Sequence, residues 1–221
     1  MAKNLAPLSP QNWPFSLDWL PSSAYLVGGA VRDALLNRQE YLDLDFVLPT
    51  EAVETARRIA NHYQVGFVVL DEQRQIARVV FAQGTVDFAL QEGDSLETDL
   101  QRRDFTVNAI AYNPHTENLI DPLQGLVDLN TGVMRMISKA NLEDDPLRLL
   151  RAYRQAAQLN FTIEPHTRST IRNLAPLLDK VAAERVQTEL GYLLANSQGS
   201  KWLIAAWEDG LLPVWLKNAS L

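Results

Sequence analysis

The sequence predicts an α+β protein in which a small mixed β-sheet with flanking helices is followed by an all-helical region. Up to about residue 138, short runs of β-branched and aromatic residues alternate with helical stretches. After Ser138, apolar residues recur with helical spacing, and Gly or Pro separates the helical pieces. We therefore predict two domains, at residues 1–138 and 139–221.

The predicted first domain combines strands with helices. Strands are expected at residues 24–29, 42–48, 66–71, 75–82 and 85–90. Helices are expected at about 30–37 and 51–62, the second with Thr50 as its N-cap. A further helix is predicted for TDLQRRDFTVNAIAYN (98–113), and the turn-rich segment after it, 113–132, is expected to be a small hairpin or a loop.

The predicted second domain consists of helices. Its apolar residues follow a helical period in four pieces, at residues 144–159, 165–181, 183–196 and 200–212. Pro146 lies where the first of these helices is expected to begin, which suits proline because the first turn needs no N–H from it.

The composition is that of an ordinary globular protein, with 47% hydrophobic and 21% charged residues in a chain of 221. Such a length is enough to bury a hydrophobic core, so disordered and fibrous proteins are excluded. The chain has no cysteine, which excludes disulfides, thiolate nucleophiles and cysteine-ligated zinc or iron–sulfur sites.

Acidic residues outnumber basic ones, 27 to 20, and the net charge is −7. This balance argues against binding nucleic acid through bulk charge, so any such contact must be local. The proline-containing N-terminus does not match a signal peptide, and no apolar run approaches a membrane span. We expect a cytoplasmic protein.

The sharpest chemical pattern is Asp43-Leu44-Asp45 in the second predicted strand. Side chains alternate between the faces of a strand, so the two carboxylates point the same way. Paired carboxylates suit Mg²⁺, which takes oxygen ligands and often shares them with phosphates. Taken alone, such a pair is more often the solvent face of an edge strand, and the neighbouring motifs decide between the two.

Gly28 and Gly29 lie at a predicted strand-to-helix turn, followed by Arg32. Glycines at such a turn let the backbone approach a phosphate, and the helix N-terminus directs N–H groups at it. A turn that needs a positive φ explains the same glycines equally well. Phosphoryl and nucleotidyl transfer need both a phosphate-binding turn and a pair of metal-binding carboxylates, and these motifs would supply them.

Three more polar residues are candidates for this chemistry. Asp87 alternates with apolar Val86 and Phe88, so it either completes the metal site from a neighbouring strand or is an exposed strand residue. Asp104 and Asn108 are four residues apart in a predicted helix, on one face. That face is suited to hydrogen-bond a ribose or a phosphate, or it is a helix surface with an ion pair.

Four motifs follow one another along the chain: VGGAVRD at 27–33, LDLDF at 42–46, RRDFTVNAIAYN at 102–113 and DDPLRLLRAYR at 144–154. In this order they resemble class II tRNA nucleotidyltransferases and bacterial poly(A) polymerases, within the DNA polymerase β superfamily of nucleotidyltransferases. The resemblance covers about residues 24–195. It implies a polymerase-β-like head domain followed by a helical neck that selects the nucleotide and binds RNA.

The resemblance also implies a chemistry. Asp43 and Asp45 would bind two Mg²⁺, so that the RNA 3′-hydroxyl attacks the α-phosphorus of a nucleoside triphosphate and pyrophosphate leaves. Asp87 is added as a third catalytic carboxylate. Nucleotide or phosphate binding falls to Gly28, Gly29, Arg32, Arg103, Asp104, Asn108, Arg151 and Arg154.

Base selection is expected at the start of the second domain. Asp145 and Arg148 are three residues apart and are expected to share one helical face, an acceptor beside a fork of donors. Cytosine and adenine both present an amino donor beside a ring-nitrogen acceptor, and uracil and guanine reverse that order. A cap with an intrahelical ion pair is the alternative. The family's base-reading motif, Glu-Asp-x-x-Arg, favours selection, although Asp144 stands where the family has glutamate.

Residues 146–172 contain five arginines and one acid, a local charge of +4 that is suited to meet a triphosphate or an RNA end. For Arg168 and Arg172 a solvated helix face is the alternative, and no role is assigned to them. The short stretch between Asp87 and Arg102 resembles the subgroup that adds only CC. Addition of the whole CCA end, poly(A) synthesis and a non-catalytic nucleotide-binding module are the alternatives.

The expected partners are the tRNA 3′ end, CTP and ATP, with no membrane and no DNA. Family members continue past the neck into body and tail regions. The chain is therefore expected to be a fragment or a minimal protein, and to bind RNA weakly.

Overall fold

The computed structural model describes residues 8–38, 42–213 and 215, and the chain forms two compact units. The first unit comprises residues 1–102 and 107–126, and the second comprises 103–106 and 127–221. Residues 1–7 and 216–221, at the outer ends of the two predicted domains, lie outside the described residues. The units divide twelve residues before the predicted domain boundary, and the functional division at residue 138 stays a prediction.

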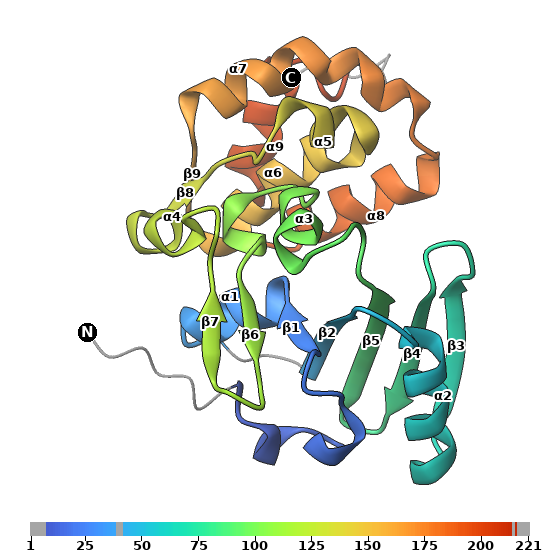
Figure 1. Ribbon diagram of the computed structural model, residues 1–221. Helices are drawn as coiled ribbons and strands as arrows, with labels where there is room; N and C mark the ends of the chain where they lie inside the picture. Colours follow the sequence, from blue (N-terminus) through green and yellow to red (C-terminus); the bar gives the residue numbers. More distant parts are fainter. Residues whose placement is uncertain (1–7, 39–41, 214, 216–221) are drawn as a thin grey trace. The chain divides into compact units, whose positions relative to one another are not determined.

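Within the described part of the first unit, seven strands form one mixed sheet in the order β3-β4-β5-β2-β1-β6-β7 (Figure 1). Strands β2 and β5 pair in parallel, and the other neighbouring pairs are antiparallel. The predicted mixed sheet is confirmed. The strands are β1 (Tyr25–Val27), β2 (Leu42–Leu48), β3 (Gly66–Asp71), β4 (Ile76–Phe81), β5 (Gly84–Leu90), β6 (Ala111–Asn113) and β7 (Asn118–Ile120).

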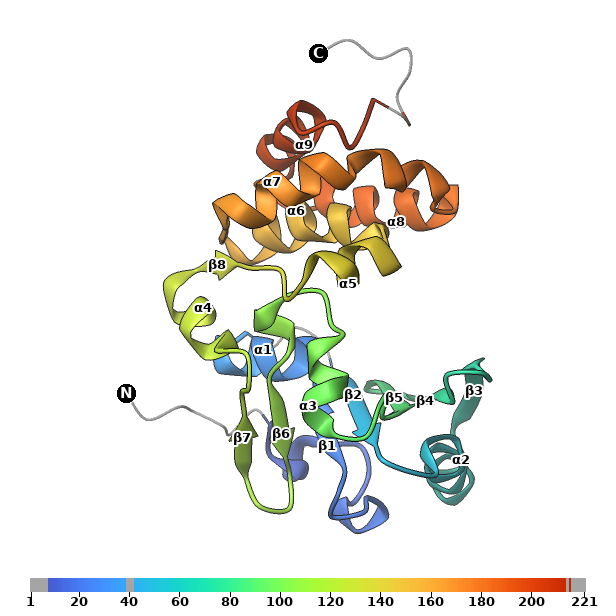
Figure 2. The same ribbon diagram turned by 45° about the horizontal axis from the view of Figure 1, so that its top comes forward.

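Helices α1 (Gly29–Leu35), α2 (Ala52–Tyr63) and α3 (Leu96–Gln101) accompany this sheet. Helix α2 packs against β3, β4 and β5, as both ribbon views show (Figures 1 and 2). The prediction of Thr50 as its N-cap is wrong. The cap is Glu51 at φ 54°, which makes no side-chain capping hydrogen bond.

Alternating burial separates the two faces of the sheet. Phe46 and Phe88 lie fully inside, stacked with ring centroids 5.6 Å apart. Trp13 and Phe15, from the N-terminal segment, contact the Phe46 ring. Aromatic pairs of this kind add about 0.5–1.5 kcal/mol beyond the area that they bury. One face is therefore the core, and the polar side chains of β2 and β5 lie on the other.

The helix expected over residues 98–113 is wrong. Helix α3 ends at Gln101, residues Thr106–Asn108 form the single 3₁₀ turn η4, and Ala111–Asn113 form strand β6. Backbone pairing of β6 with β1 and β7 overrides the helical spacing of the apolar residues. The expectation of a small hairpin or a loop over residues 113–132 is right for its first part only, because β6 and β7 pair directly but Gly125–Thr131 form helix α4.

The described part of the second unit is mainly helical, with one two-residue parallel pair, β8 (Val133–Met134) with β9 (Thr162–Ile163), and an isolated bridge between Phe105 and Met136. Helix α6 packs against both α8 and α9, and α5 packs against α7 (Figure 2). The predicted all-α region is thus confirmed, with β9 as the exception. The helices are α4 (Gly125–Thr131, from Val127 on in this unit), α5 (Lys139–Asp144), α6 (Leu147–Leu159), α7 (Pro165–Leu174), η5 (Ala175–Lys180), α8 (Ala183–Leu194) and α9 (Gly199–Glu208).

Across the residues that the structure describes, no helix is both long enough and apolar enough to span a membrane. The cytoplasmic location stays a prediction.

Candidate active site

Asp43 and Asp45 lie on the same face of β2, as the strand period predicts. Leu44 between them is 5% exposed and belongs to the core, whereas Asp43 is exposed and Asp45 is half-buried. On the parallel strand β5, Thr85 is in register with Asp43 and donates its hydroxyl to Asp43 Oδ1 at 2.6 Å. The neighbouring strand thus restrains the Asp43 carboxylate.

Asp87 on β5 is in register with Asp45 on β2. Its face is the one that alternation predicts, since Val86 and Phe88 on either side are fully buried. On the other side of β5, Arg78 of β4 is in register with Asp87 and holds its carboxylate through two nitrogens, at 2.7 and 2.8 Å. The three carboxylates therefore lie on adjacent strands, with an arginine at their edge.

The pKa of Arg78 is raised, first by its hydrogen bonds with Asp87 and then, against some burial, by the charges of Asp87, Asp43 and Asp45. The guanidinium of Arg78 thus interacts electrostatically with all three carboxylates. Sequence reasoning missed Arg78, although a signal for it was present. In the predicted 75–82 and 85–90 hairpin, a turn centred on residues 82 and 83 places residue 78 opposite residue 87.

The donor set of this face fits a hard divalent cation, because carboxylate oxygens are the ligands that Mg²⁺ prefers. In the described residues, no group of three or more Asp, Glu or His side chains is placed so that it could hold a metal ion, so the candidate ligands are the two carboxylates of β2. An open set of carboxylates suits a cation that completes its shell with substrate phosphates and water. Metal binding by Asp43 and Asp45 stays a prediction.

Gly28 lies at the turn between β1 and α1, and Arg32 lies within α1. Gly28 is the N-cap of α1 with φ 73°, a conformation that favours glycine. Arg32 is 12% exposed at its side chain and pairs with Asp33 through two nitrogens, both at 2.8 Å. Its third nitrogen donates to Asn108 Oδ1 at 2.7 Å. Two of the sequence motifs therefore meet in the first unit, at Arg32 and Asn108, while Gly29 opens the helix.

Asp104 and Asn108 do not share a helical face, which corrects the prediction. Asp104 belongs to the second unit, where its Oδ1 accepts from the backbone N–H of Phe105 and its Oδ2 accepts from Arg151 Nε at 3.0 Å. Asp104 is 6% exposed, and its charge is the leading cause that raises the pKa of Arg151. The backbone carbonyl of Arg103 accepts from the side chain of Asn141.

Asp145 does not stand in the same helix as Arg148. Asp144 ends α5, Asp145 is its extended C-cap and α6 begins at Leu147, so the predicted shared helical face is wrong. Asp145 Oδ1 accepts from the N–H of Leu147, and the ion pair to its Oδ2 comes from Arg185, at 3.0 Å. Arg148 Nη1 donates to the carbonyl of Asn141 at 2.8 Å. The N-cap of α6 is Pro146, and the Asp145 side chain binds the N–H of the first residue of that helix.

The arginine-rich stretch of residues 146–172 is largely neutralised by acids of the same unit. Arg154 is 15% exposed at its side chain and donates to Glu189 at 2.5 Å and to Gln158 at 2.7 Å. Arg168 and Arg172 both bind Asp209, each at 2.6 Å. The expected free basic face is therefore reduced, and packing is the role that the contacts of Arg154 favour.

Asp209 is the centre of a buried cluster. Its side chain is fully buried and also accepts from the hydroxyl of Tyr153, which is itself fully buried. Burial alone would raise the pKa of Asp209, but hydrogen bonds from Arg168, Tyr153 and Arg172 outweigh it and lower that pKa. Burial and the contact with Asp209 raise the pKa of Tyr153. Helices α6 and α7 thereby meet the end of α9.

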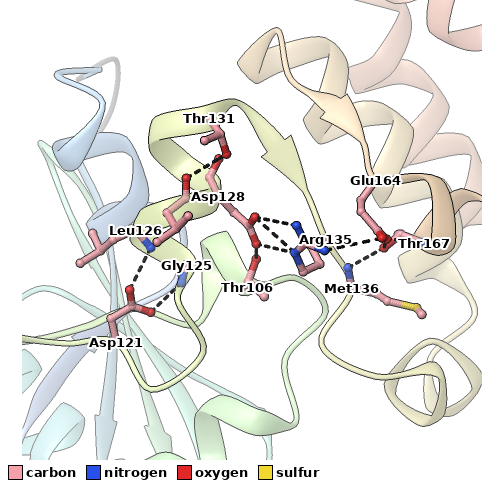
Figure 3. Close-up of polar contacts among 11 residues, drawn as sticks. Thr106, Asp121, Gly125, Leu126, Asp128, Thr131, Arg135, Met136, Glu164 and Thr167 are labelled. Carbon is pink, nitrogen blue, oxygen red and sulfur yellow. Dashed lines mark hydrogen bonds and ion pairs between the residues drawn. The ribbon is translucent and has the colours of Figure 1, made fainter.

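A second polar cluster surrounds Asp128 in the second unit (Figure 3). Asp128 accepts from the Thr106 hydroxyl at 2.7 Å and from Arg135 Nε at 3.0 Å. Arg135 also pairs with Glu164 at 3.5 Å, and Thr167 donates to Glu164 at 2.7 Å. Burial would raise the pKa of Glu164, but the Thr167 hydrogen bonds and the Arg135 charge lower it. This cluster ties residue 106 to the segment after residue 127.

Figure 3 also shows Asp121, which belongs to the first unit. Its two carboxylate oxygens accept from the backbone N–H groups of Gly125 and Leu126, at 2.7 and 2.9 Å. These contacts close the turn at the end of that unit. Sequence reasoning had no signal for the Asp128 and Asp209 clusters, since most of their partners come from tertiary packing, and it did not single out Asp121, whose partners are backbone groups four and five residues further on.

The chain belongs to the family of poly A polymerase head domains. The model of that head domain matches residues 24–135, and a second model, described as the probable RNA and SrmB-binding site of polymerase A, matches residues 160–220. The resemblance drawn from the four motifs is confirmed.

Three similar proteins sharpen this placement. The chain is 63% identical over 212 residues to a CC-adding tRNA nucleotidyltransferase of Synechocystis, covering 96% of this chain and 51% of that protein. It is 40% identical over 201 residues to an A-adding tRNA nucleotidyltransferase of Deinococcus radiodurans, covering 89% and 45%. A solved tRNA-processing enzyme with CTP superposes with a TM-score of 0.80 at 31% identity, covering 90% and 56%. The chain spans about half the length of the curated relatives that it matches.

Proposed function

We propose that the chain is a CC-adding tRNA nucleotidyltransferase, which adds cytidines from CTP to the 3′ end of tRNA. The observation that carries this proposal is the carboxylate face of β2, where Asp43 and Asp45 lie together with Asp87 in register beside them. The 63% identity to a CC-adding relative supports the choice of reaction.

Enzymes of this family use a divalent metal, and Mg²⁺ at Asp43 and Asp45 is part of this proposal. When bound, two such ions would lower the pKa of the RNA 3′-hydroxyl and neutralise the triphosphate. Thr85 holds the Asp43 carboxylate through its 2.6 Å hydrogen bond, so that this group needs less reorganisation. In-line attack at the α-phosphorus then releases pyrophosphate.

Further roles are assigned by resemblance to the family. In the first unit, Gly28, Gly29, Arg32 and Asn108 would bind phosphate or ribose, supported by the contact between Arg32 and Asn108. In the second unit, Arg103, Asp104 and Arg151 would contribute to nucleotide binding, with Arg154 as the member whose burial argues for packing instead. We assign catalysis to residues 1–138, and nucleotide selection with RNA binding to 139–221.

Base selection is assigned to Asp145 and Arg148, with Asp144 beside them. An acceptor and a multi-donor guanidinium match the amino group and ring nitrogen of cytosine, and they would leave unpaired polar groups against uracil. Such unpaired groups are costly when they are buried, so the discrimination is strong. Arg185 holds Asp145 at 3.0 Å and would position its carboxylate for this purpose.

Adenosine addition is the second candidate, because the chain is also 40% identical to an A-adding relative. Asp145 and Arg148 do not separate the two bases, since cytosine and adenine present the same order of donor and acceptor. Poly(A) synthesis and a non-catalytic nucleotide-binding module are the remaining alternatives, and the same assay distinguishes them.

The test is a primer-extension assay with Mg²⁺, each labelled nucleoside triphosphate in turn, and tRNA transcripts that end before, within and after CCA. We expect two cytidines on the first transcript and no product on the last. The Asp43→Ala/Asp45→Ala variant should give no product, and its circular dichroism should match that of the wild type.

Other products would replace the proposal. A complete CCA end would show a CCA-adding enzyme, adenosine added only to a transcript ending in CC would show an A-adding enzyme, and extension past three nucleotides would show a poly(A) polymerase. Nucleotide binding without incorporation on any transcript would favour the binding module.

A further inference from the structure

Helix α9 packs against α6 and α8 and leaves one of its faces exposed. Gly199 and Ala206 are buried on the packed side. Positions 201, 204, 205 and 208 are three and four residues apart, so they share one face of the helix, opposite to the buried residues. Three of these four are exposed and one is half-buried. We call this set the outer face of α9, and it consists of Lys201, Ile204, Ala205 and Glu208.

Exposed apolar side chains gather on α8 and α9. Among the described residues of the second unit, four large apolar side chains are exposed, and three of them belong to these two helices: Tyr192, Leu194 and Ile204. The start of α9 lies tightly against the last turn of α8, because a Cβ on Gly199 would overlap the carbonyl of Leu193. Single exposed apolar residues are common, but several on adjacent helices indicate a surface that a partner covers.

The two charges of the outer face oppose the dipole of their own helix. Lys201 is the third residue of α9, and Glu208 is its last. A helix N-terminus favours negative charge and a C-terminus favours positive charge, so each side chain stands at the end that disfavours it. Neither forms an ion pair with another described residue, and Lys201 Nζ lies 6.0 Å from the centroid of the Trp202 ring. The described chain by itself does not account for this charge pattern.

The outer face is complementary to itself when two copies of α9 lie antiparallel. With a two-fold axis midway between positions 204 and 205, Lys201 of each copy lies opposite Glu208 of the other. Ile204 then lies opposite Ala205 of the second copy, so that a large side chain meets a small one. Each charge also stands beside the end of the second helix that stabilises it. A parallel pair would instead place lysine against lysine.

These features favour a second copy of this chain over RNA as the partner. One lysine and one glutamate give the outer face no net charge, whereas a surface that binds RNA carries an excess of positive charge. The ten residues of α9 span about 15 Å, so the paired faces bury less than a standard interface of about 1,600 Å². A weak dimer is therefore expected.

We propose that the outer face of α9 is a self-association surface, through which two copies of this chain form a weak antiparallel dimer. The four residues of this face have no part in the proposed catalysis, nucleotide binding or base selection. Self-association can therefore be tested without any measurement of nucleotide incorporation.

The first test is sedimentation equilibrium of the full chain from about 1 μM to about 1 mM. The apparent mass should rise with concentration from that of one chain toward that of two. Ile204→Glu places a charge at the centre of the paired faces and should weaken association by at least about ten-fold. Glu184→Lys is the matched control, because it reverses an exposed charge in the first turn of α8, and it should stay within about twofold of the wild type.

Charge reversal tests the antiparallel pairing. Lys201→Glu and Glu208→Lys each replace attraction by repulsion at both ion pairs, so each should weaken association by roughly ten-fold. In an equimolar mixture of the two variants, one outer face carries only negative charge and the other only positive charge. The mixture should therefore associate at least as tightly as the wild type. The double variant Lys201→Glu/Glu208→Lys should also recover the wild-type dissociation constant.

Several results would overturn the proposal. A chain that stays monomeric at every concentration would do so, and weaker tRNA binding by Ile204→Glu would then assign the outer face to RNA. A dimer that neither Ile204→Glu nor the charge reversals weaken would place the interface on another surface. Failure of the mixed variants to associate would exclude the proposed ion pairs. Thermal unfolding checks that each variant is folded.

Discussion

On the sheet of the first unit, Asp43, Asp45 and Asp87 lie on adjacent strands, with Arg78 pairing Asp87 at their edge. In the second unit, Asp209 receives two arginines, and Glu189 is paired with a largely buried one. Like charges placed side by side cost folding energy and favour a cation, whereas acids enclosed by arginines hold helices together. The comparison teaches that the first unit places carboxylates side by side at the proposed active site, whereas the second unit matches its buried acids with arginines that hold helices together.

The largest expected effect is loss of activity without loss of stability in the first unit. Asp45→Asn should lower nucleotide incorporation by at least about 1,000-fold, because it removes a proposed metal ligand. Its free energy of unfolding in urea should stay within about 1 kcal/mol of the wild-type value, since Asp45 is half-buried and asparagine keeps the size of the side chain. A marked loss of stability would break the comparison.

The next effect is a loss of stability in the second unit. Asp209→Asn should lower the free energy of unfolding by about 3 kcal/mol, because it leaves Arg168, Arg172 and the buried Tyr153 hydroxyl poorly matched. Urea unfolding followed by tryptophan fluorescence measures this. A change below about 0.5 kcal/mol, the size of an ordinary surface substitution, would show that the cluster does not hold the helices.

This effect should depend on pH. The pKa of Asp209 is lowered in the folded protein, so its ionised form contributes stability above the unfolded pKa of about 4, and this stability is lost as the pH falls through the lower folded pKa. The difference in unfolding free energy between the wild type and Asp209→Asn should therefore be full at neutral pH and shrink below about pH 4. Urea unfolding at a series of pH values tests this, and a constant difference would contradict it.

A smaller loss is expected at the pair between α6 and α8. Glu189→Gln should lower the free energy of unfolding by about 2 kcal/mol, since Arg154 is left largely buried without its counter-charge. Surface substitution Glu184→Gln, at the first turn of the same helix, is the matched control and should change it by less than about 0.5 kcal/mol. Equal changes in the free energy of unfolding for the two variants would show that the buried pair of Glu189 with Arg154 contributes no more than an exposed glutamate.

The smallest effect returns to the first unit. Thr85→Val removes the hydroxyl that restrains Asp43, a loss of about 1 kcal/mol or several-fold in incorporation rate. Thr85→Ser keeps the hydroxyl and should stay close to the wild type. If valine and serine act alike, the hydrogen bond to Asp43 has no part in the reaction.

Much of the fold was predictable because strand and helix periods are local properties. Strand β2 matches its prediction at Leu42–Leu48, and the common face of Asp43 and Asp45 follows from alternation alone. The helix expected at 98–113 failed because burial on every side hides the period. Phe105, Val107 and Ile110 are all fully buried in the structure, and strand pairing with β1 begins only after them, at Ala111.

The site was predictable in part, for the same reason. Residues whose geometry depends on one strand, Asp43 and Asp45, were placed correctly relative to each other. The relative placement of Asp104 and Asn108 was not predicted, because the two residues belong to different units and bind different arginines, Arg151 and Arg32. Asp145 and Arg148 were expected on one helix, but the chain breaks between α5 and α6 there.

The sequence by itself determined the α+β class, the paired carboxylates of β2 and the family, since these rest on backbone periodicity and on motifs in order. Only the tertiary structure decided which acid meets which arginine: Asp87 with Arg78, Asp104 with Arg151, and Asp209 with Arg168 and Arg172. Ion-pair partners stand far apart in the sequence in most of these cases. The packing of whole strands and helices brings these ion-pair partners together, and the local periodicity of the sequence does not show which residues will pair.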